Sequence, residues 1–140
     1  MINITIPGQP VAKGRPRVSF VTKRTYTPEK TVSYENLIKT VFSEKYPDHT
    51  PWDVPLVVNI ILSMQIPSSW SKKRQESAIN YDLMPVTKPD IDNCVKAICD
   101  ALNRIAWRDD SIIVQLQVIK VYSITPSTQI IALPLKDLIS

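Results

Sequence analysis

The apolar residues of this chain change period several times, and prolines stand at several of the changes. Ile2, Ile4 and Ile6 alternate with polar residues, which is the pattern of a strand buried on one side. Residues 34–42 instead space their apolar side chains three and four apart, as an amphipathic helix does. A chain that switches between these two periods buries sheet faces against helix faces, and a two-layer domain fits this pattern best.

The same patterns predict six main elements along the whole chain. Thr27, Pro28 and Glu29 are typical of a helix start, with a capping hydroxyl, a proline at the first helical position and an acid in the first turn. Residues 8–25 show no periodicity and are predicted to form a loop. The predicted elements are strands at 1–6, 54–66, 111–122 and 129–135, main helices at 27–46 and 90–105, and a short helix within 68–80 that is capped by Ser69 or Ser71.

These elements predict one α+β domain over residues 1–140, in the order β-α-β-α-β-β. We expect two main helices on a mixed sheet of about four strands, with the last two strands forming an antiparallel hairpin. Cys94 and Cys99 are expected to be small buried side chains rather than a disulfide framework. Because no long apolar stretch and no secretory signal is visible, we expect a cytoplasmic protein that does not enter a membrane.

The two glycines and single histidine of the chain exclude several kinds of site. Gly8 and Gly14 fit neither a dinucleotide fingerprint nor a P-loop, so no nucleotide cofactor is expected. His49 alone gives little support to a zinc site or to a nucleophile triad. The stretch that begins at Asp90 is not an EF-hand loop, because Val95 stands where that loop needs glycine.

The net charge of +4 is concentrated in one segment. Residues 11–30 hold six lysines and arginines against one glutamate. Such a segment suits phosphate groups, although a solvated loop whose charge aids solubility is the alternative. A second, smaller basic patch lies beside Trp70, which we expect to anchor its loop on the core. The residues predicted to contact DNA are Lys13, Arg15, Arg17, Lys23, Arg24, Lys72, Lys73 and Arg74.

A different segment gathers acidic residues. Asp90 and Asp92 stand two apart at the start of a predicted helix, and Asp109 and Asp110 precede a strand that can lie beside it. Carboxylates brought together repel one another and favour a hard divalent cation, Mg²⁺ or Mn²⁺. Helix caps and a turn are the alternative interpretation of the same residues.

Several short motifs lie in and around these two charged segments. They are KGRPR at 13–17, YTP at 26–28, PSSWSKKR at 67–74, KPDIDN at 88–93, DAL at 100–102 and WRDD at 107–110. Together they resemble the signature of RusA-type Holliday junction resolvases, in the phage-type branch of that family of bacterial and prophage endodeoxyribonucleases. The resemblance covers nearly the whole chain. It implies a Mg²⁺-dependent homodimer that nicks two strands of a four-way DNA junction in recombination and repair.

The resemblance also implies a role for individual residues. Asp90, Asp92 and Asp110 match the three metal-site aspartates of the family, and Lys96 matches its catalytic lysine. The implied reaction is in-line hydrolysis, with Lys96 positioning the phosphate or stabilising its developing charge. Asp100 is expected to hold Lys96 through an i,i+4 ion pair. Two further neighbours expected to support the site are Asp109, as an alternative ligand, and Asn93.

Two alternatives remain open from the sequence. One is a nuclease of the same chemistry that acts mainly on flaps or replication forks. The other is a DNA-binding module without catalysis, whose aspartates only cap helices and turns. The first differs in its preferred substrate, and the second predicts binding that is indifferent to Mg²⁺.

Overall fold

The computed structural model describes residues 1–14 and 17–139, and it is built around a four-stranded sheet in the order β1-β6-β4-β5. The pairs β1–β6 and β6–β4 are antiparallel, whereas β4–β5 is parallel. The predicted α+β class with a mixed sheet is therefore confirmed. The strands are β1 Ile2–Pro7, β4 Leu56–Gln65, β5 Ile113–Ser123 and β6 Ser127–Pro134.

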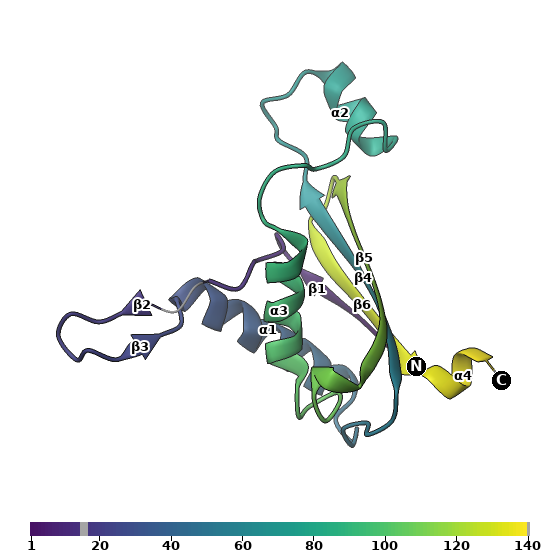
Figure 1. Ribbon diagram of the computed structural model, residues 1–140. Helices are drawn as coiled ribbons and strands as arrows, with labels where there is room; N and C mark the ends of the chain where they lie inside the picture. Colours follow the sequence, from purple (N-terminus) through teal and green to yellow (C-terminus); the bar gives the residue numbers. More distant parts are fainter. Residues whose placement is uncertain (15–16, 140) are drawn as a thin grey trace.

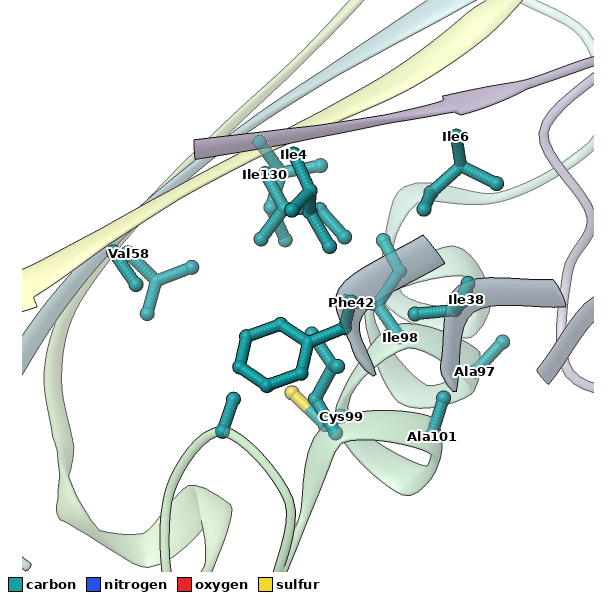
Figure 2. Packing of buried hydrophobic residues seen from close by; sticks show 14 of the residues in the cluster. Ile4, Ile6, Ile38, Phe42, Val58, Ala97, Ile98, Cys99, Ala101 and Ile130 are labelled. Atoms are coloured by element: carbon teal, nitrogen blue, oxygen red, sulfur yellow. The ribbon is translucent and has the colours of Figure 1, made fainter. Parts of the chain in front are cut away.

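Helices α1 (Glu29–Lys45) and α3 (Ile91–Leu102) lie on one side of this sheet (Figure 1). Ile4 and Ile130 point from the sheet toward Phe42 of α1 and Ile98 of α3 (Figure 2). All four side chains are at most 2% exposed. The two helices and the inner face of the sheet therefore form one apolar core, as the two periodicities predicted.

Two helix starts test the predicted capping. The short helix α2 (Lys72–Ile79) is capped by Ser71, the second of the two predicted caps, whose hydroxyl accepts the backbone N–H of Arg74 at 3.2 Å. At α1 the prediction was wrong by one position, because Pro28 is the N-cap and no side chain caps the helix. Proline has a fixed φ that suits the cap as well as the first turn, so sequence alone does not distinguish the two positions.

The predicted hairpin of the last two strands was wrong. Strands β5 and β6 follow one another in sequence, but each pairs with β4 on opposite sides. β4 is the most apolar strand, and its central place gives it hydrogen-bonded neighbours along both edges. β5 is consequently an edge strand, and its Leu116 and Ile119 remain 42% and 48% exposed.

The predicted loop at residues 8–25 contains a small hairpin. Strands β2 (Arg17–Val18) and β3 (Thr25–Tyr26) form an antiparallel pair that projects away from the sheet and helices (Figure 1). Two residues per strand are too few for a period to show in the sequence. The remaining elements are a 3₁₀ turn at Asp110–Ile112 and a short helix α4, Leu135–Ile139.

Two predictions about buried side chains are confirmed. Cys94 and Cys99 are free thiols that are 1% and 6% exposed. Burial raises the pKa of Cys94 to about 11 and that of Cys99 to about 12, so both thiols stay protonated near neutral pH. None of the described helices is long and apolar enough to cross a lipid bilayer.

Candidate active site

A groove of about 900 Å³ lies between the basic loop, the start of α1 and the start of α3. Lys30 and Lys88 on its walls are exposed, as is the carboxylate-bearing Asp90. Asn93 also lines it, one turn into α3. The groove therefore combines cations that suit phosphate with an acid that suits a metal ion.

The two acids of the KPDIDN motif stand at the start of α3. Asp90 is the N-cap of the helix by its backbone, yet its side chain makes no capping hydrogen bond. Asp92, in the first turn, accepts the backbone N–H of Asn93 at 2.9 Å. Neither carboxylate pairs with a cation in the described part of the chain. Both side chains are exposed and remain available to a ligand.

A lysine that the sequence did not single out fixes the backbone just before Asp90. The Lys120 ammonium, on β5, donates to the carbonyl oxygens of Thr87 and Pro89 at 2.8 and 3.0 Å. The peptide bond between Lys88 and Pro89 is cis. These two hydrogen bonds of Lys120 hold the chain just before α3. In the sequence, the residue stands out only as a single cation within an apolar strand.

Asp109 and Asp110 have different surroundings. Asp109 caps the 3₁₀ turn, and its Oδ2 accepts the backbone N–H of Ser111 at 3.0 Å. Hydrogen bonding to Ser111 is the main reason why the pKa of Asp109 lies below its usual value. The Asp110 side chain is exposed in the first turn of this element. Asp109 thus serves the turn, as one interpretation of the sequence allowed, and Asp110 faces solvent.

The structure does not gather the predicted carboxylate ligands of the described residues into one metal cluster. Besides burial, the charges that act on the pKa of Cys94 include Asp90 and Asp92. Those that act on Cys99, more than a turn further on, include Asp110. Within residues 1–14 and 17–139, no three histidine, cysteine, aspartate or glutamate side chains are close enough to hold a metal ion. The predicted ligands are therefore near one helix but are not gathered around a point.

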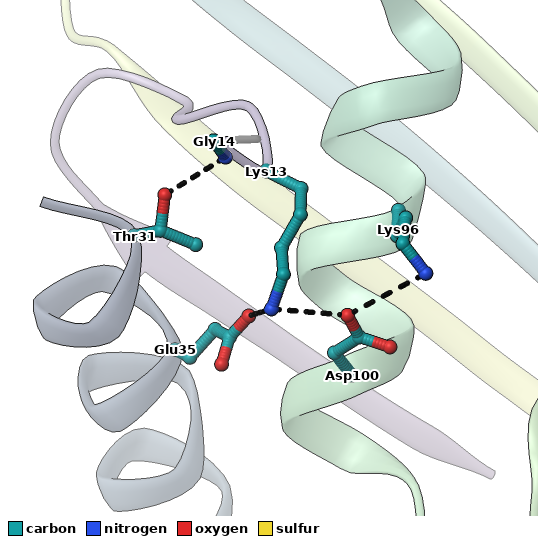
Figure 3. A network of polar contacts seen from close by, with 6 residues as sticks. All are labelled: Lys13, Gly14, Thr31, Glu35, Lys96 and Asp100. Atoms are coloured by element: carbon teal, nitrogen blue, oxygen red, sulfur yellow. Dashed lines mark hydrogen bonds and ion pairs between the residues drawn. The ribbon is translucent and has the colours of Figure 1, made fainter. Parts of the chain in front are cut away.

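Lys96 and Asp100 form the predicted i,i+4 ion pair, with 3.8 Å between Nζ and Oδ2. The same Asp100 oxygen lies 3.1 Å from the Lys13 ammonium, which also contacts Glu35 of α1 at 2.6 Å (Figure 3). The Lys13 side chain is only 16% exposed, whereas that of Lys96 is 64% exposed. Lys13 therefore links α1 to α3, and Lys96 points its charge toward solvent.

The basic loop is fixed to both helices at Lys13 and Gly14. The backbone N–H of Lys13 donates to the carbonyl of Asn93, and that of Gly14 to the Thr31 hydroxyl, both at 2.9 Å. A Cβ on Gly14 would lie 2.7 Å from the Pro28 ring, so only glycine fits this approach. Sequence analysis missed Glu35 and Thr31, because their partners lie 22 and 17 residues away.

The other predicted DNA contacts lie on two projections. Lys23 and Arg24 are exposed in the β2–β3 hairpin, whereas Arg15 and the side chain of Arg17 lie outside the described residues. The second projection is α2, where Arg74 stacks over the Trp70 ring at 3.9 Å. That ring meets Tyr122 of β5 edge-on, with 5.2 Å between centroids, so the tryptophan anchors its loop as predicted. The exposed cations on α2 are Lys72, Lys73 and Arg74.

An α+β domain whose groove sets the exposed carboxylate of Asp90 beside exposed lysines suits a protein that acts on phosphodiesters. Residues 7–131 match the family model of endodeoxyribonuclease RusA. The chain belongs to this family of DNA-cleaving nucleases, which confirms the resemblance seen in its motifs. It is similar to the uncharacterized protein YqaN of Bacillus subtilis strain 168, with 37% identity over 133 residues, 92% of this chain and 93% of that protein.

Proposed function

We propose that this protein is a Mg²⁺-dependent endodeoxyribonuclease that resolves four-way junctions by paired nicks. Its setting would be DNA recombination and repair in the cytoplasm. The observation that carries the proposal is the groove whose walls hold the exposed carboxylate of Asp90 together with the exposed lysines Lys30 and Lys88. Membership of the RusA family makes branched DNA the expected occupant of this groove.

The side chains present fit a hard cation by their chemistry. Asp90, Asp92 and Asp110 offer only oxygen donors, which suits Mg²⁺, with Mn²⁺ as a substitute. All three are exposed, so a cation can reach each carboxylate without unpacking the core. When bound, the cation supplies a water of lowered pKa and neutralises charge on the scissile phosphate. These three aspartates are the proposed ligands.

Lys96 is the proposed cation of the chain itself at the reacting phosphate. Its ammonium is exposed and stands one helical turn after Asp92, on the side of α3 that carries Asp100. The Asp100 carboxylate restrains the ammonium, and Lys13 holds that carboxylate from the other side. A lysine restrained in this way can meet a non-bridging phosphate oxygen and stabilise the charge that develops there.

Paired nicks need two sites, and we include a homodimer in the proposal. Its support is the sheet face that α1 and α3 do not cover. A hollow of about 700 Å³ on this face is lined by uncharged side chains, among them Asn59, Ile61, Gln117 and Ile119. The Asn59 amide oxygen is buried there without a hydrogen-bond partner in the described structure. Depletion of charge is typical of interface centres, and amides can both donate and accept across a two-fold axis.

Size-exclusion chromatography with light scattering, which measures the molar mass of the protein, tests the dimer. Ile119→Lys puts a charge in the uncharged hollow, and we expect it to halve the measured mass. Val86→Lys, at a position that is 90% exposed and outside this hollow, is the matched control and should keep the mass of the dimer. A wild-type chain with the mass of one copy contradicts the dimer.

The activity is tested with a labelled four-way junction, a fork, a flap and a linear duplex, each with and without Mg²⁺. We expect symmetrical nicks in the junction only with the metal. Asp92→Asn should bind the junction but not cut it, since it keeps the size of the side chain and removes the charge. Asp48→Asn, at an exposed acid of the α1–β4 connection, is the control and should cut like the wild type.

Two other results each select one of the alternatives. Preferred cutting of forks or flaps identifies a branched-DNA nuclease of the same chemistry. Binding without cutting in either Mg²⁺ or Mn²⁺ identifies a DNA-binding module and refutes the catalytic proposal.

A further inference from the structure

The tip of the β2–β3 hairpin exposes two apolar side chains. Phe20 is 99% exposed and Val21 is 93% exposed, and they are adjacent in the chain. A phenylalanine ring that is wholly in water is unfavourable, and it is best explained by a partner that covers it. Neither residue belongs to the groove or to the motifs that indicated the family.

The turn that presents these side chains is well held. The backbone N–H of Ser19 donates to the backbone carbonyl of Arg24 at 2.9 Å, and the N–H of Lys23 donates to the carbonyl of Ser19 at 2.8 Å. The Ser19 hydroxyl also accepts the N–H of Thr22 at 3.2 Å. Lys23 adopts the left-handed conformation, with φ of 55°, which turns the chain back after the tip. Phe20 and Val21 are thus presented by a specific turn at the far end of the hairpin.

The hairpin rises from the wall of the candidate active site. Gly14 and Pro28, which flank the hairpin segment, both line the groove that contains Asp90. They also meet each other, since a Cβ on Gly14 would lie 2.7 Å from Pro28. The segment between them therefore leaves and re-enters the protein at one point beside the groove. A nucleic acid lying in the groove would pass the base of this projection.

The charge around the tip favours DNA as its partner. Residues 15–28 contain four lysines and arginines and no acid. Lys23 and Arg24 are exposed directly after the tip. An apolar side chain flanked by cations matches a base step flanked by phosphates, whereas an apolar protein surface would leave these charges without partners.

We propose that the β2–β3 hairpin is a wedge, in which Phe20, supported by Val21, inserts against the bases of branched DNA while Lys23 and Arg24 contact the flanking phosphates. The inference rests on the proposed function, because it needs DNA in the groove. Insertion separates stacked bases, and this costs least where stacking is already interrupted, as at a branch point. The wedge would therefore favour branched over linear DNA without reading sequence.

The test uses four-way junctions and linear duplexes that carry 2-aminopurine, whose fluorescence rises when it is unstacked. It is made in EDTA, so that the readout does not depend on cleavage. We expect the wild type to raise the fluorescence at the branch point and Phe20→Ser to abolish the rise, with Phe20→Trp restoring it. Junction affinity of Phe20→Ser should fall roughly 5-fold or more, the loss of one stacked base, with duplex affinity unchanged within about 2-fold.

Ile139→Ser is the matched control, at a position of α4 that is 76% exposed and lies on the opposite side of the molecule from the hairpin (Figure 1). It should leave both readouts unchanged. An undiminished fluorescence rise with Phe20→Ser overturns the wedge alone, provided the wild type still cuts junctions. A lower oligomeric mass of that variant also overturns it and assigns the tip to contact between protein copies. If the wild type binds neither the four-way junction nor the linear duplex, the wedge and the proposed function are both refuted.

Discussion

Replacing Lys13 tests whether this cation of the basic loop stabilises the fold or contacts DNA. Lys13→Met keeps most of the aliphatic stem but removes the ammonium that Glu35 and Asp100 share at 2.6 and 3.1 Å. Hydrogen bonds between charged groups contribute about 1.5–3 kcal/mol, and breaking a fully buried ion pair costs about 3–5 kcal/mol. Glu35 is 14% exposed and Asp100 is 29% exposed, so this pair is only partly buried. We expect the free energy of unfolding to fall by about 2–3 kcal/mol.

Equilibrium unfolding in urea measures this loss. A double-mutant cycle with Glu35→Gln separates the contact from other effects of each change, and we expect a coupling free energy of about 1–2 kcal/mol. The same proteins test the DNA contact, because each phosphate contact adds about 0.9 to the slope of log affinity against log salt. A slope unchanged by Lys13→Met agrees with a structural role. A coupling below about 0.3 kcal/mol, or a slope reduced by about one, would refute it.

The same network makes stability depend on alkaline pH. Burial, the largest influence on the pKa of Lys13, lowers it, but the hydrogen bonds and the charges of Glu35 and Asp100 together outweigh burial and raise the pKa above its ordinary value of 10.5. The stabilisation is therefore complete below pH 10.5 and is lost as the pH rises through the higher folded value. The difference in stability between wild type and Lys13→Met should shrink in that range.

Three further predictions concern the core and α2. Burial raises the pKa of Cys99 from 9.0 to about 12, so this thiol ionises in the unfolded chain before it does in the folded one. The free energy of unfolding should therefore fall as the pH rises above 9. Unfolding measured at several pH values should show a smaller fall for Cys99→Ala. Phe42→Ala, at a side chain that is 2% exposed, should cost about 3–5 kcal/mol in urea unfolding, and a loss under 1 kcal/mol would contradict its place in the core. Trp70→Ala removes the ring between Arg74 and Tyr122, so amide hydrogen exchange should speed up in α2 but not in β4. An unchanged exchange rate in α2 would refute the role of Trp70 in anchoring its loop.

The order and type of the main elements followed from the sequence. Alternation and helical spacing are properties of neighbouring residues, so they identified β1, α1, β4 and α3 without knowledge of the fold. The Ser71 cap and the ion pair between Lys96 and Asp100 were predictable for the same reason, since each joins residues three or four apart. The acidic motif at the start of α3 was likewise evident from the order of its residues alone.

Other features were decided only by tertiary structure. The place of β4 between β5 and β6 depends on pairing between distant strands, which no local period encodes. The contact of Lys13 with Glu35 joins residues 22 apart, and it turned a cation expected to contact phosphate into a link between helices. Whether Asp110 joins Asp90 and Asp92 depends on where β5 begins relative to α3, and no three such side chains come together in the described residues.

The hairpin shows the division most clearly. Its composition was evident as a basic segment without periodicity, and that alone favoured contact with phosphate. Which apolar side chains reach its tip depended on a turn held by Ser19, Lys23 and Arg24 and on the close approach of Gly14 to Pro28. Sequence determines which groups a chain can offer, because charge and period belong to the residues themselves. The fold determines which of them meet one another and which remain free for a partner, because that depends on packing between distant segments.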